Sequence, residues 1–439
     1  MLDVDITVKN HIINNLLENI LEISFPWQSE GNEIAPITMK NIVEESMTLK
    51  QSICSESKLK FGGCIASEFS ISLCDDEERS FAEKDLKGKW ILVKLTQKYL
   101  GNNIYPGENI YPTTNLFPGQ QIQTKEFFLF NGYIDSLKYS SGDKHKFDLV
   151  AYDYFGKLNT KDGTNELLTQ WGNATFRPLG TMLRIFINNI HSTNVSPITG
   201  LLSSTFVAGG TTKTKIYDFP TMNSYWLTNK DKTTYGEVAR YLCEMVGCFG
   251  YIMPNTDNKE GNFVLAYLDF SDKYETYGFY EELNFEDFKT NGYSGLSWTY
   301  GGEQKKSSKE KISKFFPNIV PDSATKNIYD MTDNICCWQQ EISSGENFHI
   351  LDDFYNTSNV FNRFYNSGYI PFTAKVDGRP WVQVGDNVQF NVYETDVNGE
   401  PVLDNNGNQK ITTVNSVVLS RTLSGIQALT DTLETKGEM

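Results

Sequence analysis

Residues 125–159 read KEFFLFNGYIDSLKYSSGDKHKFDLVAYDYFGKLN and hold two segments rich in aromatic and β-branched residues. Between the segments lies Ser140-Ser141-Gly142-Asp143, a run of small and polar residues that favour tight turns. Aromatic and β-branched side chains fit the pleated, half-buried surface of a sheet. The stretch therefore predicts two strands joined by a hairpin, and it sets the interpretation of the sequence on either side.

The sequence before this hairpin continues the same pattern. Residues 41–54, NIVEESMTLKQSIC, and residues 58–74, KLKFGGCIASEFSISLC, are again rich in β-forming residues, and Gly62-Gly63 marks a bend or bulge. A further strand is predicted from Trp90 to Leu95, after Gly88. Together these segments predict a β-barrel or sandwich over residues 25–160.

An amphipathic helix is predicted in the first 24 residues, ahead of this β-rich region. The apolar residues at helical spacing are Ile12, Ile13, Leu16, Leu17, Ile20 and Leu21. A helix this short is marginal alone in water. We therefore expect it to dock on its own domain or on a partner.

The middle of the chain, residues 161–324, is predicted to be a mixed α/β region. Helical periodicity covers residues 178–190 and 233–250, and residues 261–270, GNFVLAYLDF, predict a strand. The pattern returns to β in residues 325–439. There, PWVQVGDNVQF at 380–390 predicts a strand, a Gly-Asp turn and a second strand, and KITTVNSVVLSRTLSGIQALTD predicts a long closing strand.

Residues 103–120 read NIYPGE NIYPTT NLFPGQ, a hexad written three times. Each Pro fixes its own φ and biases the preceding aromatic residue towards extended conformations. Tyr105, Tyr111 and Phe117 therefore recur on one side of an extended segment. Two interpretations follow: a surface loop that folds back on its own domain, or an arm that lays its aromatics against a neighbouring subunit.

The composition limits the possible partners. The 439 residues include 39 basic and 55 acidic residues, a net charge of −16, and 13% are aromatic. An acidic chain repels phosphate, so we expect neither specific nucleic-acid binding nor adhesion to anionic membranes. We find no secretory signal in MLDVDITVKN and no run of about 20 apolar residues, so stable membrane insertion is not expected.

The cysteines predict reduced thiols rather than a disulfide framework. The seven positions are 54, 64, 74, 243, 248, 336 and 337, an odd number without a CxxC pair. The ten-residue spacing of Cys54, Cys64 and Cys74 falls in strand-like sequence and would allow these three to lie side by side. We expect buried, reduced thiols made in a cytoplasm.

Motifs for catalysis or metal binding are not found. The four histidines, His11, His145, His191 and His349, lack metal-ligand spacing, and there is no GxSxG, P-loop or GxGxxG motif. The acidic and amide residues between Asp396 and Asn408 do not fit a Ca²⁺ loop and are better explained by hairpin turns. The carboxylate pairs Asp352-Asp353 and Glu281-Glu282 are what any chain with 55 acids contains. We therefore expect no catalytic, metal-binding or cofactor-binding residues, and no enzyme activity.

An ordered set of segments carries a resemblance to a known family. These are residues 41–73, then LKGKWILV at 86–93, then FNGYIDSLKYSSGDKHKFDLVAYDYFGKL at 130–158, and finally GRPWVQVGDNVQF at 378–390 and VVLSRTLSGIQALTD at 417–431. The chain resembles the baseplate hub, or tail-tip, proteins of bacteriophages and prophages of Gram-positive bacteria. The resemblance is strongest over residues 38–160 and 370–432, and the hexads resemble the YP-rich insertions of such tail proteins.

The resemblance implies a fold and a role. The fold would be mainly β, with two small β-barrels flanking an α+β middle, and the chain would assemble as a homotrimeric ring in the virion tail tip or baseplate after synthesis in the host cytoplasm. The ring would join the tail tube or distal tail protein to a tip or spike protein, with the tape-measure protein as a further partner, and would let DNA or tail contents pass. The interface residues we expect are Tyr105, Tyr111, Phe117 and Trp381.

Two other functions stay open from the sequence. One is a receptor- or carbohydrate-binding tail protein that uses surface Tyr and Trp to stack on sugars. The other is a tail-associated peptidoglycan hydrolase. We do not expect the hydrolase domain that some related tail proteins carry after the hub region, because the sequence ends directly after the last predicted strand.

Overall fold

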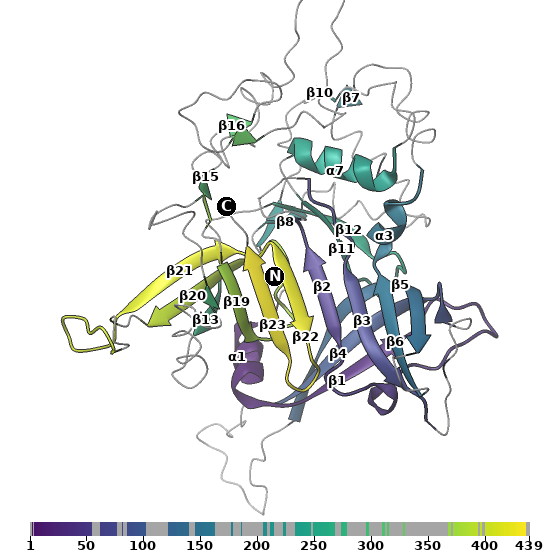
Figure 1. Ribbon diagram of the computed structural model, residues 1–439, viewed down its shortest axis with the longest axis horizontal. Coiled ribbons are helices and arrows are strands. Elements are labelled where there is room, and N and C mark those ends of the chain that lie inside the picture. Colours follow the sequence, from purple (N-terminus) through teal and green to yellow (C-terminus); the bar gives the residue numbers. More distant parts are fainter. Residues whose placement is uncertain are drawn as a thin grey trace, which may run out of the picture.

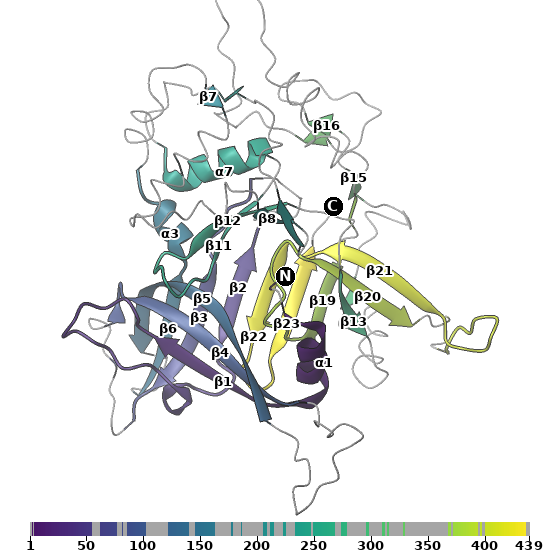
Figure 2. The same ribbon diagram turned by 180° about the vertical axis from the view of Figure 1, so that it is seen from behind.

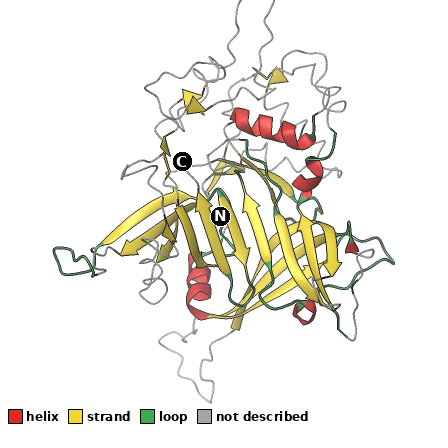
Figure 3. Cartoon of the chain, in the orientation of Figure 1, coloured by secondary structure: helices red, strands yellow, loops and turns green. Residues whose placement is uncertain are grey.

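The computed structural model is dominated by β-sheet, as Figure 3 shows. The residues that the structure describes are 2, 4–54, 62–76, 81, 86–101, 122–139, 145–162, 177–178, 186, 205–208, 211–214, 223–224, 233–246, 249–267, 274–278, 296–297, 310–311, 314–315, 328–329, 368–369, 372–393, 396 and 400–435. The helices are α1 (Ile6–Asn15), the short 3-10 helix η1 (Met39–Asn41), α3 (Tyr154–Leu158) and α7 (Tyr235–Val246).

The largest sheet of the described residues has ten strands, drawn from both ends of the chain (Figure 1). Their order is β1 (Leu16–Ser24), β4 (Trp90–Leu100), β5 (Ile122–Tyr139), β6 (Lys146–Tyr152), β3 (Glu68–Cys74), β2 (Thr48–Ser52), β22 (Ser420–Ser424), β23 (Thr430–Thr435), β19 (Phe372–Asp377) and β14 (Leu296–Ser297). The strands of the predicted hairpin, β5 and β6, pair antiparallel.

Smaller sheets surround this one. A four-stranded sheet has the order β11 (Phe249–Met253), β12 (Asn262–Tyr267), β8 (Thr205–Ala208) and β9 (Thr211–Thr214), and a three-stranded sheet has the order β13 (Tyr274–Gly278), β20 (Asn387–Tyr393) and β21 (Ile411–Val417). The two-stranded sheets are β7 (Arg177–Pro178) with β10 (Asn223–Ser224), β15 (Glu310–Lys311) with β18 (Gly368–Tyr369), and β16 (Lys314–Phe315) with β17 (Ile328–Tyr329).

Alternation of apolar and polar residues produces the central strands. In β3, the odd-numbered residues Phe69, Ile71 and Leu73 are buried, and β6 places Ala151, Leu149 and Phe147 directly opposite them. Cross-strand pairs of this kind are the unit of sheet stabilisation. Gly132 in β5 lies so close to β6 that an added Cβ would be 2.1 Å from the Tyr152 carbonyl oxygen, so a larger residue would push the strands apart.

The two β-rich ends of the chain meet where β2 pairs with β22. Leu49 lies opposite Leu423, and both side chains are buried in the core. The mainly β character expected from the sequence is therefore confirmed. The sheets are open rather than closed barrels in the part of the chain that is described, and strands from residues 25–160 and 325–439 share one sheet.

The N-terminal helix is shorter than the sequence predicts. We expected it within residues 1–24, but α1 ends at Asn15, and Leu16–Ser24 is strand β1, which pairs with β4. The physical reason is that Asn19, Leu21 and Ile23 are buried with a period of two, which suits a strand. Tertiary pairing thus overrides the helical spacing of the apolar residues.

The expected strand at residues 380–384 is also wrong, since these residues form turns, and β20 begins only at Asn387. Buried side chains, rather than a neighbouring strand, bind this backbone: the Arg421 guanidinium donates to the Val382 and Arg379 carbonyl oxygens. The long closing strand is divided into β21, β22 and β23. Gly425, with a φ of +82°, begins the turn that reverses the chain between the last two.

The middle region contributes α7 and β12, both at predicted positions. Figure 1 shows α7 lying across one end of the large sheet, next to α3 and β11. The helix expected at residues 178–190 falls almost wholly outside the described residues, and the predicted domain boundaries stay a prediction.

Candidate functional site: two polar joints between the ends of the chain

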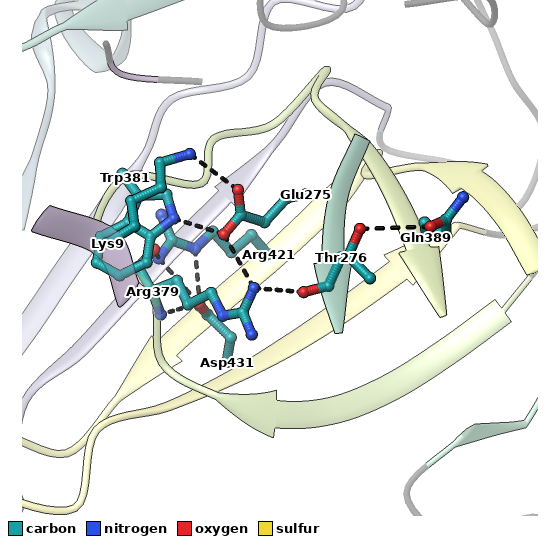
Figure 4. A network of polar contacts seen from close by, with 8 residues as sticks. All are labelled: Lys9, Glu275, Thr276, Arg379, Trp381, Gln389, Arg421 and Asp431. Carbon is teal, nitrogen blue, oxygen red and sulfur yellow. Dashed lines mark hydrogen bonds and ion pairs between the residues drawn. The ribbon is translucent and has the colours of Figure 1, made fainter. Parts of the chain in front are cut away.

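Two groups of polar contacts tie the N-terminal segment to the C-terminal strands. We name the first the ionic joint; it consists of Lys9, Glu275, Arg379, Trp381, Arg421 and Asp431 (Figure 4). We name the second the turn clasp; it consists of Asn19, Glu45, Gln97 and the turn at residues 425–428. Figure 2 shows the setting of the first, with α1 beside β13 and the C-terminal strands.

Glu275 of β13 is the centre of one half of the ionic joint. Its Oε2 accepts from Lys9 Nζ of α1 at 2.9 Å. Its Oε1 accepts from Arg379 at 2.9 Å and from the Trp381 indole at 2.8 Å. Glu275 is 6% exposed as a residue, so three donors from two distant segments replace the water that burial removes.

Arg421 of β22 and Asp431 of β23 make the other half of the ionic joint. Arg421 Nε lies 2.7 Å from Asp431 Oδ1, and its terminal nitrogen lies 3.0 Å from Oδ2. This two-bond arrangement is the strongest geometry available to an Arg–carboxylate pair. Asp431 also accepts from the Arg379 backbone NH at 2.9 Å, which links the two halves.

Aromatic rings enclose these charges. The Arg379 guanidinium lies over the Tyr277 ring, 3.9 Å from its centroid, and Lys9 lies over the Trp381 ring. Burial raises the pKa of the Tyr277 hydroxyl far above its usual range, so this group is neutral. The Leu2 backbone NH donates to the Trp381 carbonyl oxygen at 2.9 Å and brings the N-terminus to the same place.

The turn clasp holds the turn between β22 and β23. Oε1 of Glu45 accepts from the backbone NH groups of Gln427 at 2.8 Å and Ala428 at 3.2 Å, and Oε2 accepts from Ile426 at 2.8 Å. Asn19 of β1 donates to the Ile426 carbonyl oxygen at 2.7 Å and receives a bond from Gln97 of β4. Two N-terminal side chains, Glu45 and Asn19, therefore bind one C-terminal turn directly, and Gln97 holds Asn19 in place.

The hydrogen bonds of the clasp keep Glu45 ionised. Burial alone would raise the pKa of this carboxyl, but the backbone NH groups of Ile426, Ala428 and Gln427 outweigh burial, and the pKa lies below its ordinary value of 4.5. A carboxylate that accepts several backbone NH groups is bound most strongly when it is charged. The clasp is therefore sensitive to acid.

The chemistry of both joints is suited to holding segments in place. Each carboxylate is bound by cations or NH groups of the chain itself. No group of three or more His, Cys, Asp and Glu side chains that could hold a metal ion occurs in the described residues. Among the helices that the structure describes, none has the length and apolar character needed to cross a membrane.

The structure corrects the expectation for Trp381. We predicted an interface residue, but its side chain is 1% exposed and contacts Lys9, Glu275 and the Phe127 ring of the same chain. Its indole NH needs a buried acceptor, and Glu275 supplies it. The hexad residues Tyr105, Tyr111 and Phe117 lie outside the described residues.

Other candidates from the sequence resolve as follows. Hairpin geometry explains the acidic segment after Asp396: Asp404 Oδ1 accepts from the backbone NH groups of Asn406 and Asn408, and Leu403 forms a bridge with Gln409. The pairs Asp352-Asp353 and Glu281-Glu282 lie outside the described residues.

Motif searching does not find the polar residues of the joints, because most of their partners lie outside any local motif: Lys9 and Glu275 are 266 residues apart, and Trp381 and Glu275 are 106 residues apart. One signal was present. Arg421 is two residues before Leu423, and Asp431 is two residues before Leu433, so each charged residue lies on the same face of its strand as a buried leucine. A charge in that position indicates a buried partner.

An exposed apolar area lies at one end of the large sheet. It comprises Ile13 of α1, Leu16 and Leu17 of β1, and Ile122 of β5, with exposed fractions of 43%, 39%, 49% and 63%. The register brings Leu16 and Ile122 to the same end, because Leu16 pairs with Tyr99 while the adjacent Leu100 pairs with Ile122. Along the chain, Leu17 is next to Leu16 and Ile13 is three residues before it. We name this area the sheet-end patch.

The chain was compared with protein families, curated sequences and solved structures. No protein-family model and no curated protein sequence matches the chain. Among solved structures, the chain is similar to the 43 kDa tail protein of prophage MuSo2 from Shewanella oneidensis, with 10% identity, coverage of 96% of this chain and 98% of that chain, and a TM-score of 0.42. It is also similar to the prophage tail protein gp18 from Listeria monocytogenes EGD-e, with 9% identity, coverage of 96% and 95%, and a TM-score of 0.42.

A third structure of this kind is an E. coli component of the type VI secretion system, described as similar to the T4 bacteriophage tail proteins gp27 and gp5. It shares 7% identity, with coverage of 91% of this chain and 75% of that chain and a TM-score of 0.39. Two of these three solved structures are prophage tail proteins, and the third is a component of the type VI secretion system.

Proposed function

We propose that this chain is a structural baseplate-hub or tail-tip protein of a phage tail or a phage-like injection device. The observation that carries the proposal is which segments of the chain supply the strands of the large sheet. The segments in which the sequence resembles hub proteins, residues 38–160 and 370–432, supply most of that sheet, and β2 pairs directly with β22. The segments that resemble hub proteins are therefore the ones that build the large sheet of the molecule.

The polar joints support a holding role. A hub must keep its faces in fixed positions while neighbouring proteins pull on them. Breaking a buried ion pair by removing one partner is costly, so the ionic joint resists separation of α1, β13 and the last strands. The turn clasp does the same for the turn between β22 and β23.

The finer proposal is a homotrimeric ring. Three chains would meet through heterologous interfaces that close by rotation, and the ring would bind the tail tube or distal tail protein on one face and a tip or spike protein on the other. The two small barrels of the hub plan, and a role for the tape-measure protein, stay predictions for the assembled ring.

The sheet-end patch is the contact surface that we assign to a second copy of the chain. Its aliphatic side chains would lose water on assembly, which is the usual driving force of a stable interface. In the sequence the hexads lie between Leu100, the last residue of β4, and Ile122, the first residue of β5, and these two residues pair at this end of the sheet. The arm interpretation of the hexads is therefore our proposal, with Tyr105, Tyr111 and Phe117 against a neighbouring subunit.

The net charge suits a conduit. A basic lumen would retain DNA through release of counterions, whereas a chain with a net charge of −16 repels phosphate. We propose that the lumen of the ring is acidic or neutral and that DNA or tail contents pass without binding. No enzyme activity is part of this proposal.

Electron microscopy of assembled particles tests the function. Tails produced with an epitope-tagged copy of the chain are labelled with gold-conjugated antibody, and the same tails carrying a tagged capsid protein serve as the control. We expect gold at the tip or baseplate, at the end of the tube opposite the head. Label distributed along the tube, on the head, or absent from purified particles would contradict the proposal.

A further inference from the structure

Two buried cysteines from distant segments touch each other. Cys64 Sγ lies 3.6 Å from Cys243 Sγ, the two residues are 179 positions apart, and both side chains are fully buried. Neither of the two forms a disulfide bond in the structure. A disulfide bond is about 2.05 Å long, so the two sulfur atoms would have to approach each other by about 1.5 Å to form one.

The backbone of Cys64 is held against the middle region. Cys64 forms a parallel bridge with Gly250 at the start of β11, and the Gly250 backbone NH donates to the Gly63 carbonyl oxygen at 3.0 Å. The Cys64 carbonyl oxygen accepts from Arg240 Nε of α7 at 3.4 Å. Position 64 is therefore fixed from two sides.

The space around the sulfur atoms is shaped for them. A Cβ on Gly250 would lie 2.6 Å from Cys64 Sγ and 2.6 Å from the Phe263 ring, so only glycine leaves room for this sulfur. Cys243 lies on α7 one turn after Arg240, hence on the same face of the helix. The residue that binds the Cys64 backbone and the residue that contacts its sulfur thus act from one helix face.

We propose that Cys64 and Cys243 are an oxidative modification site, at which a disulfide bond fastens α7 to the segment leading into β3. The inference stands independently of the proposed function. It extends the sequence prediction of reduced thiols, because a chain made in a reducing cytoplasm acquires this bond only after transfer to oxidising surroundings.

The oxidant that we assign is a low-molecular-weight disulfide such as oxidised glutathione. One protein thiolate attacks a glutathione sulfur, a protein–glutathione mixed disulfide forms, and one glutathione leaves as thiolate. The second protein thiolate then attacks the protein sulfur of the mixed disulfide and releases the second glutathione. The two protein thiols lose two electrons to the oxidant, and their two protons end on the two glutathione thiols.

Burial determines how this reaction proceeds. The oxidant reaches the sulfurs only when α7 moves away from residue 64, so the first step is slow. When α7 returns, the second thiol is already in contact with the mixed disulfide, so the second step is fast. The product is an intramolecular crosslink rather than a stable glutathione adduct.

The full-length chain, purified with reductant, tests the proposal. After reductant removal it is incubated with oxidised glutathione to the end point, the remaining thiols are blocked with N-ethylmaleimide, and peptides are identified by mass spectrometry. We expect a peptide pair joined through Cys64 and Cys243 that disappears on reduction. We also expect a higher midpoint of thermal unfolding for the oxidised chain, because the bond closes a long loop.

Two variants serve as controls. Cys54→Ser removes a half-buried cysteine of the same N-terminal region and should keep both the crosslink and the higher midpoint. Cys243→Ser should lose both. Recovery of Cys64 and Cys243 as maleimide or glutathione adducts from the folded wild-type chain, or a bond from either to another cysteine, would overturn the proposal. Equal midpoints for reduced and crosslinked chains would show that the bond does not fasten α7.

Discussion

Glu45 combines a strained backbone with a demanding side-chain role. It has a φ of 54°, a value that L-residues other than glycine rarely adopt, and its carboxylate accepts three backbone NH groups of the turn after β22. The strain is retained because the carboxylate and the turn are held together.

Replacing Glu45 by Gln tests this role. The amide places an NH2 group where one carboxylate oxygen accepted an NH, so we expect the free energy of unfolding to fall by about 1–2 kcal/mol in urea titrations at neutral pH. The folded-state pKa of Glu45 is lowered, so its contribution is present above the ordinary pKa of 4.5 and is lost as the pH falls through the folded value. The difference in the free energy of unfolding between the wild type and the Glu45→Gln variant should therefore become smaller in acid.

Glu44→Gln is the matched control, because Glu44 is an exposed neighbour. It should unfold like the wild type at every pH. If the Glu45→Gln variant loses the same free energy of unfolding at acidic pH as at neutral pH, the carboxylate charge does not hold the turn.

Single residues also mark what the sequence does and does not predict. The hairpin interpretation of Asp404 and its neighbours is confirmed, because Asx turns depend on nearby residues alone. The sequence predicts Trp381 as an interface residue, whereas the structure has Trp381 buried within the chain. Its partner Glu275 lies in a distant strand, and local sequence carries no sign of that contact.

Strands β22 and β23 have a charged pair on their buried face. Arg421 lies opposite Leu433, and Asp431 lies opposite Leu423, so the two charged side chains are diagonal neighbours. Both are at most 2% exposed. A buried pair of this kind is costly to form and still more costly to break on one side.

Substitutions in this pair should be strongly coupled. Asp431→Asn leaves the Arg421 charge without its buried partner, and we expect a loss of about 3–5 kcal/mol in the free energy of unfolding. The double variant with Arg421→Met should lose less than the sum of the two single variants, as a urea-based double-mutant cycle measures.

Lys50→Met provides the control for the cycle. Its partner Glu68 is on the neighbouring strand, but the Lys50 side chain is 57% exposed, so we expect a change below about 1 kcal/mol. If the losses in the free energy of unfolding at Arg421 and Asp431 are additive, the two side chains do not stabilise each other.

At the scale of elements, the content of β-forming residues predicts where strands lie but does not predict where they begin and end. The hairpin strands β5 and β6 lie where the sequence is rich in aromatic and β-branched residues. The first 24 residues were assigned to one helix, because apolar residues in LLENILEIS also satisfy helical spacing. Pairing with β4 makes residues 16–24 a strand rather than a helix. The sequence of residues 16–24 does not show this, because their partners lie in a distant segment.

The whole molecule depends on contacts between its ends. The pairing of β2 with β22 joins residues about 370 positions apart, and no local pattern in the sequence indicates it. The sequence did indicate two β-rich ends and a mixed middle. It did not indicate that the described strands of both ends share one open sheet.

The sheet-end patch makes a prediction about assembly. Leu17→Ser combined with Ile122→Ser removes exposed aliphatic surface without touching the core, so the far-ultraviolet circular dichroism spectrum should be unchanged while self-association weakens at least tenfold, as sedimentation equilibrium measures. Leu403→Ser, at an exposed leucine in another hairpin, is the control and should associate like the wild type. Equal association constants for all three would exclude the patch as a contact.

The hexads make a separate prediction. Replacing Tyr105, Tyr111 and Phe117 together by Ser should weaken assembly and leave the fold of each chain intact, because the arm is proposed to act on a neighbour. Co-purification of untagged with tagged chains measures this. Unchanged recovery of the untagged chain would end the arm interpretation.

Light scattering coupled to size-exclusion chromatography tests the central claim most directly. If the joined ends of the chain form the scaffold of a closed ring, the purified full-length protein at high concentration, alone or with the tail-tube protein, should have three copies in each particle. A particle that contains one copy under both conditions would contradict the account.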